Sequence, residues 1–315
     1  MQQLKKIFFD QQDALKRNDS AFKAVHEQVL NTYGKNALAI VVYGSCLSQT
    51  TQKKDSVPDY FVIVDSFQAY YSSLIQSSLN TFLPPNIYHF AIEQGFSKYS
   101  VVSLKQLQSQ TQLIVSPKAK DMYFLGRFSK NTYIYWSQDT RIKDALLEVQ
   151  NQACQSVAMI VLSSMNLGDK ISLNDFALKC LALSYVGDVR VEAKDKVEKL
   201  FLAEEKFYLS VYQEILCHFH QQKIISFDQT QKYLTLLDKT LLPKKYKRFI
   251  LKSKLRAQLR WPKGMLTAKN WLDYVLLKIR RNYGDEFTLT EREKKYWFIF
   301  GWKLLFKLNR KKLLK

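Results

Sequence analysis

The chain has 315 residues, of which 47% are hydrophobic and 24% charged, so one or two domains with a full core are expected and disorder is excluded. The formal charge is +20, but residues 244–315 hold 22 Lys and Arg against five acids and carry +17 of it. A general nucleic-acid coat would spread its charge over the main fold. The concentration of positive charge in the last quarter of the chain instead predicts a patch or tail that faces an anionic partner. No stable nucleic-acid partner is expected.

The cysteines and the N-terminus bear on the compartment and on metal binding. Cys46, Cys154, Cys180 and Cys217 have no paired spacing, which indicates reduced thiols and neither a disulfide framework nor a zinc site. We expect no signal peptide, because Asp10 follows a short apolar run directly, and no acid-poor transit peptide. No segment reaches the roughly 18 apolar residues that span a bilayer.

Strands and helices are mixed in the first part of the chain. Helical spacing of apolar residues predicts helix over 3–33, with a possible second start at 18–20. Buried strands are predicted at 38–42 and 61–64, with a polar loop at 50–57 between them. A helix over 66–83 and short strands at 87–92 and 100–104 follow.

Helices dominate the remainder. We expect them over 141–165, 173–185, 194–217 and 229–242. The change in character predicts three units: a domain at 1–140 with a mixed sheet, a mostly helical domain at 141–290, and a tail at 291–315. The fold class is therefore α/β (α+β).

The turn after the first buried strand is the first chemical signal. Tyr43-Gly44-Ser45 ends that strand, and Asp59 and Asp65 flank the next one. Nucleotidyltransferases of the polymerase-β type hold a nucleoside triphosphate in this way, because glycine admits phosphates close to the backbone N–H groups. A plain turn is the alternative.

Carboxylates near such a turn suggest Mg²⁺, which prefers oxygen ligands. On an extended strand, six residues at about 3.3 Å each separate Asp59 from Asp65 by roughly 20 Å, so the two do not share one ion. Asp59 is the leading ligand, Asp55 in the preceding loop is the alternative second ligand, and Asp65 is secondary.

The last segment combines aromatic and basic residues. A basic helix of this kind suits the interface of an anionic bilayer, where each cation contributes about 1 kcal/mol. The alternative is a terminal helix that packs its aromatic residues on the domain. The expected membrane-contacting residues are Trp297, Phe298, Trp302, Lys303, Phe306, Lys307, Arg310, Lys311 and Lys312.

Four later segments make the turn more specific. Residues 97–103 (SKYSVVS) resemble a KYGVIS motif, 125–130 (LGRFSK) an AGRLxKP motif, 183–190 (LSYVGDVR) an LSYxGDxRM motif, and 262–268 (PKGMLTA) a KGxxTAG stretch. With the opening turn, they follow the order known from the mitochondrial translocator assembly and maintenance protein family. That family comprises peripheral-membrane phosphatidate cytidylyltransferases, and the resemblance covers residues 40 to about 280.

The resemblance implies a nucleotidyltransferase domain, a helical domain, and Mg²⁺-dependent reaction of CTP with phosphatidate to give CDP-diacylglycerol and pyrophosphate. Asp59, Lys98 and Arg127 would be the catalytic residues. The nucleotide would be bound by Tyr43, Gly44, Ser45, Lys130, Asp188 and Arg190, although a local ion pair at a turn is the alternative for the last two. A bacterial member at the cytoplasmic face of a membrane is expected.

The chain also departs from the family pattern. Cys46 stands where the family has glycine, Asn131 where it has proline, and residues 66–73 contain no histidine. Two other hypotheses therefore stay open. One is a nucleotidyltransferase that acts on RNA, a protein or a soluble phosphate, and the other is a nucleotide-binding protein with a degenerate site.

Overall fold

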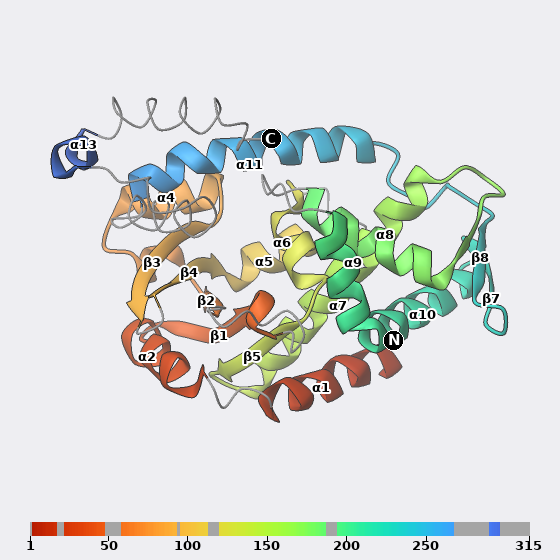
Figure 1. The fold of residues 1–315 in the computed structure, drawn as a ribbon, viewed down its shortest axis with the longest axis horizontal. Coiled ribbons are helices and arrows are strands. Elements are labelled where there is room, and N and C mark those ends of the chain that lie inside the picture. Colours follow the sequence, from red (N-terminus) through yellow and green to blue (C-terminus); the bar gives the residue numbers. More distant parts are fainter. Residues whose placement is uncertain are drawn as a thin grey trace.

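The computed structural model describes residues 2–17, 22–47, 58–92, 95–112, 120–186, 194–267 and 290–296. A sheet with its flanking helices occupies one end of the molecule, further helices extend to the other end, and α11 runs along one long edge (Figure 1). The helices are α1 (Gln2–Arg17), α2 (Lys23–Tyr33), α3 (Phe67–Tyr70), α4 (Leu74–Phe82), α5 (Leu104–Thr111), α6 (Met122–Phe128), α7 (Thr140–Ser164), α8 (Leu173–Val186), α9 (Lys194–Ala203), α10 (Glu205–Gln221), α11 (Tyr246–Thr267) and α13 (Glu291–Lys295). The strands are β1 (Ala37–Tyr43), β2 (Asp59–Val64), β3 (Asn86–Ile92), β4 (Gly95–Ser103), β5 (Thr132–Ser137), β6 (Lys170–Ser172), β7 (Ile225–Asp228) and β8 (Tyr233–Leu236).

The main sheet has the strand order β3-β4-β2-β1-β5. Strands β2 and β4 are parallel, and the other neighbours are antiparallel, so the sheet is mixed as predicted. The predicted strands at 38–42, 61–64, 87–92 and 100–104 are confirmed, although β4 begins earlier, at Gly95.

Both faces of the sheet are covered, which explains the unbroken apolar runs of β1 and β2. Val41 and Phe61 face a core shared with α6 and α7, whereas Val42 and Val62 face a second core shared with α2. Period-two alternation sends neighbouring residues of one strand into different cores. Packing on both faces therefore holds the end of the sheet in a fixed position.

The predicted helix at 229–242 is wrong. This segment contributes to a small antiparallel sheet of order β6-β8-β7, so the second part of the chain is not purely helical. Apolar residues alternate in burial along β7 and β8, and Asp228 accepts hydrogen bonds from the backbone N–H groups of Thr230 and Gln231 at the turn. Alternation and an aspartate turn outweigh the weak helical spacing of this segment.

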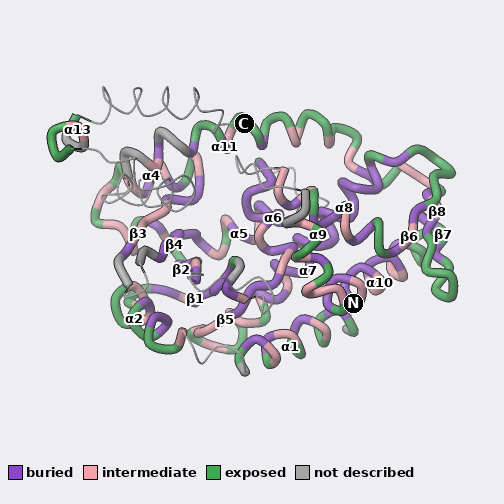
Figure 2. Tube along the Cα trace, viewed as in Figure 1, coloured by how far each residue is buried: buried purple, intermediate pink, exposed green. Residues whose placement is uncertain are grey.

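The other predicted helices are found with altered bounds. The segment 66–83 forms α3 and α4, and 194–217 forms α9 and α10, which part at Glu204. A further helix that the sequence analysis did not predict, α11, follows the small sheet. Its turns on the outer edge of the molecule are exposed (Figure 2).

The predicted domain division and the predicted absence of a membrane-spanning segment concern the chain as a whole. A single core cluster extends from Leu4 of α1 to Leu242, across the predicted boundary near residue 140, and the division into domains stays a prediction. Within the described ranges, no helix is both long enough and apolar enough to cross a bilayer.

Candidate active site at the end of the main sheet

Gly44 directly follows β1, at the end of the sheet where the site was expected. Its φ is +108°, a conformation that favours glycine. A Cβ at this position would lie 3.3 Å from Oδ2 of Asp59, so the backbone of the turn lies directly against that carboxylate. The turn and the first carboxylate of β2 therefore form one structural unit.

Asp59 begins β2 and pairs with two neighbouring strands. It lies opposite Tyr43 on β1 and opposite Lys98 on β4. Nζ of Lys98 is 2.9 Å from Oδ2 of Asp59, and the two side chains are 10% and 20% exposed. A largely buried ion pair with access to solvent thus lies at the rim of the sheet.

The same row of the sheet continues to β3, where His89 lies opposite Lys98. Tyr88 and Phe90 pack in the second core, so His89 is on the face that carries Lys98 and Asp59. The sequence analysis missed this residue. The signal was a polar residue between two aromatic ones in a predicted strand.

Arg127 of α6 covers this face next to the end of β1. Its guanidinium lies over the ring of Tyr123, at 3.6 Å from the centroid, and 6.0 Å from that of Tyr43. The Tyr43 ring is buried and stacks on Phe61, with 4.3 Å between centroids. Burial raises the pKa of Tyr43 well above its usual value, Tyr123 and Asp59 raise it further, and Arg127 opposes them. Tyr43 is thus a neutral residue that shapes the site from within the core.

Two of the sequence motifs meet where α6 crosses α8. A Cβ on Gly126 would lie 2.3 Å from the carbonyl oxygen of Ser184, so only glycine permits this approach. Nζ of Lys130 lies 3.9 Å from the ring centroid of Tyr185, the next residue of α8. Segment 125–130 and the described part of the second motif, residues 183–186, are therefore neighbours in space.

Some expected site residues are not brought together with these. Asp65 is exposed at the far end of β2 from Asp59. Ser45 begins the short 3-10 helix Ser45–Leu47, and its side chain lies outside the described part. The other expected residues outside it are Asp55, Asp188, Arg190 and the membrane-contacting residues 297–312.

Cys46, the departure next to the turn, points away from this site. Its side chain is buried in the second core. The cysteine therefore fills core volume where the family has glycine. It does not occupy the face that carries Asp59 and Lys98.

The carboxylates near the turn decide whether a magnesium ion fits this site. Within the described ranges, no three His, Cys, Asp or Glu side chains gather into a metal site. Mg²⁺ is usually held by one or two carboxylates together with substrate phosphates. The partly exposed Asp59 carboxylate, next to a turn suited to phosphates, fits that mode as a single protein ligand.

A second cluster of charges fastens α11 beside the site. Asp121, the N-cap of α6, accepts from Nε of Arg256 at 2.6 Å and from Nη2 of Arg260 at 2.7 Å. Burial alone would raise the pKa of Asp121, but Arg260 and Arg256 hold it below its usual value. The guanidinium of Arg260 also lies 4.7 Å from the ring centroid of Tyr123, the residue that Arg127 covers.

Lys263 extends this cluster to the turn between α4 and β3. Its Nζ donates to the carbonyl oxygens of Leu83 and Pro85 at 2.5 and 2.6 Å. Burial lowers the pKa of Lys263 to about 7, and the neighbouring Arg260 and Arg256 contribute. This fixes α11 to two separate parts of the sheet domain.

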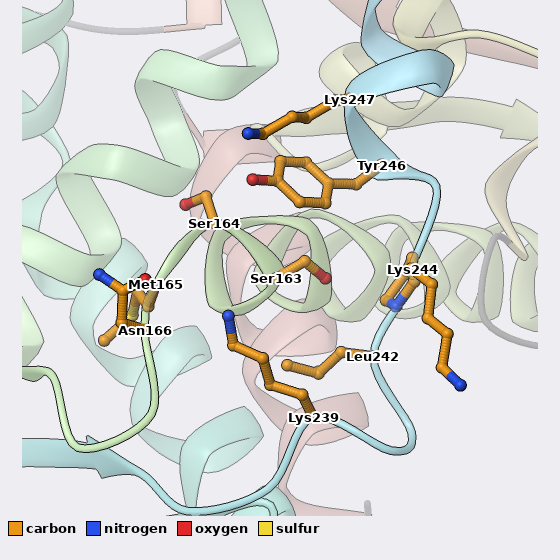
Figure 3. Close-up of a pocket in the computed structure, with 10 residues that line it drawn as sticks. Ser163, Ser164, Met165, Asn166, Lys239, Leu242, Lys244, Tyr246 and Lys247 are labelled. Carbon is orange, nitrogen blue, oxygen red and sulfur yellow. The ribbon is translucent and has the colours of Figure 1, made fainter.

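A cavity of about 520 Å³ lies elsewhere, between the end of α7 and the start of α11. Lys239 points toward Ser163 and Ser164, while Tyr246 and Lys247 lie across from it (Figure 3). None of the predicted catalytic residues lines this cavity. It is a separate basic feature.

The comparisons with known proteins bear on residues of the sheet-end site. The family described as mitochondrial phosphatidate cytidylyltransferase matches residues 66–261, more than half of the chain. The chain belongs to this family. The match contains Lys98, Arg127 and Lys130 but begins after Gly44 and Asp59, and the parallel pairing of β2 with β4 joins the two sets. A comparison with curated proteins finds no match.

Proposed function

We propose that the protein is a phosphatidate cytidylyltransferase of the polymerase-β-like nucleotidyltransferase type, which forms CDP-diacylglycerol and pyrophosphate from CTP and phosphatidate at a membrane surface. The observation that carries the proposal is the Asp59–Lys98 pair. It places a residue of the matched family segment in direct contact with the glycine turn and carboxylate that precede this segment.

The chemistry requires little beyond positioning and charge neutralisation. A phosphate oxygen of phosphatidate attacks the α-phosphorus of CTP, the bond from that phosphorus to the bridging oxygen breaks, and pyrophosphate leaves with the electron pair. The attacking phosphate is already anionic near neutral pH, so no strong general base is needed. Preorganised cations at the developing charge lower the barrier.

The residues of the sheet end divide this work. The backbone at Gly44 receives the β- and γ-phosphates, because no side chain intervenes. Lys98 moves from Asp59 to a phosphate of the nucleotide when CTP binds. Arg127 lies on the same face and neutralises a further phosphate, either of the triphosphate or of the lipid. Bound Mg²⁺ would supply further neutralisation of the triphosphate, with Asp59 as its protein ligand.

Lys130 lies against Tyr185 of α8, and Asp188 and Arg190 stay further candidates for binding the nucleotide. The departures at Cys46 and Asn131 do not alter the Asp59–Lys98 pair. Asn131 donates to Oε2 of Glu204 at 2.6 Å and thereby holds α10 at the end of α6.

The test is product formation by the purified protein with Mg²⁺, labelled CTP and phosphatidate in micelles. We expect pyrophosphate and CDP-diacylglycerol in equal amounts. Parallel reactions contain RNA, a protein acceptor or a soluble phosphate monoester. If product forms only with one of these, that molecule is the acceptor and the lipid assignment is wrong. If no product forms with any acceptor, the enzyme assignment is wrong and the hypothesis of a degenerate nucleotide-binding site is favoured.

A further inference from the structure

Helix α11 has two faces of different chemistry. On the inner face, Ser253 accepts from the backbone N–H of Met122 at 2.8 Å, and Arg256, Arg260 and Lys263 reach Asp121 and the α4–β3 turn. These contacts fix the rotation of the helix about its axis. The residues on its outer face are therefore presented outward in a defined order.

A leucine ridge, defined here as Leu251, Leu255 and Leu259, runs along the outer face. The three residues are 69%, 57% and 50% exposed. At about 100° per residue, positions four apart fall within an arc of about 80° over two turns. The three leucines therefore form a continuous apolar strip along α11. Exposed turns of this helix lie on the outer edge of the molecule (Figure 2).

Positive charge surrounds the ridge. The helix sequence from Tyr246 to Thr267 contains seven Lys and Arg and no Asp or Glu. Exposed Arg248 and Lys252 lie along the ridge on the helical wheel, and exposed Lys247 and Lys254 lie on its other side. The cations of the inner face are engaged in contacts with other parts of the protein, whereas these four face solvent next to apolar side chains.

The charged face continues past the start of the helix. Lys247 also lines the cavity at the end of α7, together with Lys239 and Tyr246 (Figure 3). Ser163 and Ser164 also line the cavity, but their hydroxyl groups already donate to the carbonyl oxygens of Met159 and Val161. The lysines around an opening of this size suit the phosphate of a lipid headgroup.

We propose that the outer face of α11 docks on an anionic lipid bilayer, with the leucine ridge in the interface and the flanking cations on lipid phosphates. An apolar strip flanked on both sides by cations is the pattern of helices that lie in a membrane interface. A nucleic acid would be met by the cations alone and gains nothing from exposed leucines. The inference extends the proposed function, whose lipid acceptor resides in such a bilayer, and it identifies a docking surface separate from residues 297–312.

The experiment is vesicle co-sedimentation of the full-length chain. Vesicles of phosphatidylcholine with phosphatidylglycerol are compared with vesicles of phosphatidylcholine alone, over a salt series. The ridge variant carries Leu251→Gln, Leu255→Gln and Leu259→Gln. The matched control carries Leu167→Gln, Leu202→Gln and Leu237→Gln, at leucines that are 62%, 68% and 54% exposed elsewhere.

We expect the ridge variant to lose binding to the anionic vesicles by about tenfold or more, since three interfacial side chains are removed. The control should bind as the wild type does, and both should show the circular dichroism of the wild type. Neutralising Lys247, Arg248, Lys252 and Lys254 to Gln should weaken binding and flatten its salt dependence.

Equal binding by the ridge variant and the wild type would overturn the proposal, as would equal loss in both triple variants. If the ridge variant loses binding to RNA, measured in parallel, while its vesicle binding is unchanged, the face binds nucleic acid and the proposal is also refuted. Catalysis is scored separately with the wild-type protein. Vesicle binding that follows the prediction while no CDP-diacylglycerol forms would support the docking surface and refute the proposed function.

Discussion

The sheet end and α11 both depend on cations, but they use them in different ways. At the sheet end, Lys98 is paired with Asp59 and Arg127 is held over Tyr123, so a few charges are fixed in position. Along α11, two of the seven cations, Arg256 and Arg260, pair with the buried carboxylate of Asp121, and the outer ones face solvent. On α11, therefore, the cations anchor the helix or face solvent, whereas those at the sheet end are the candidates for the reaction.

The largest effect is expected when the carboxylate that anchors α11 is removed. Asp121→Asn would leave Arg256 and Arg260 without their buried counter-charge, which costs about 3–5 kcal/mol when one partner of a buried pair is removed. Urea unfolding measures the loss. Asp139→Asn is the control, because Asp139 caps α7 but pairs with the highly exposed Arg141. Equal loss in the two variants would contradict the fastening role.

The sheet end is tested by changing its ion pair. Lys98→Met should lower turnover of CTP by about 10²–10³-fold, since it removes a preorganised cation at the reacting phosphates. Asp59→Asn should act similarly, and the double variant should lose less than the sum, because the two groups are in contact. Lys206→Met, at an exposed position of α10, should have no effect. Additive losses would show that the pair does not work as a unit.

The contact between the two motif segments predicts an intermediate effect. Gly126→Ala should destabilise the fold by about 1–3 kcal/mol, because its Cβ would meet the Ser184 carbonyl at 2.3 Å. Gly264→Ala is the matched control. A Cβ there meets nothing within 4 Å, and alanine favours helix by about 0.5–1 kcal/mol. Thermal unfolding should therefore move in opposite directions for the two variants.

The last effect concerns pH and is similar in size to that of Gly126→Ala. The pKa of Lys263 is about 7 in the folded protein, below the usual lysine value of 10.5, so the unfolded chain binds more protons between these values. Stability from this group therefore rises as pH increases above 7, by up to about 1.4 kcal/mol per pH unit. The difference in unfolding free energy between the wild type and Lys263→Met, measured from pH 7 to 9, should grow in favour of the wild type. A difference independent of pH would contradict the depressed pKa.

Local patterns were enough to predict four of the five strands of the main sheet, but not β5. The β-branched runs at 38–42 and 61–64 and the Gly44 turn are signals in neighbouring residues. The small sheet was misread because four-residue strands carry too little alternation to outweigh helical spacing. Helix α11 was missed, although Leu251, Leu255 and Leu259 recur at helical spacing, because cations and Pro262 interrupt the apolar pattern.

The site required contacts that no local pattern contains. The sequence predicted Asp59, Lys98 and Arg127 as separate candidates, but their relation depends on β2 pairing in parallel with β4, 39 positions later in the register. His89 enters the same row only through the β3–β4 register. The stacking of Arg127 and Arg260 on Tyr123 joins residues far apart in the sequence, and spacing cannot indicate it.

Lys98 and Arg127 are the residues through which the nucleotide is proposed to bind at the sheet end. Calorimetric titration of CTP in the presence of Mg²⁺ tests it most directly, with the wild type, the Lys98→Met/Arg127→Met variant and the Lys206→Met control. We predict that the double variant binds CTP at least about tenfold more weakly, because two charge-assisted contacts are lost, and that the control binds as the wild type does. Unchanged CTP affinity in the double variant would contradict the account.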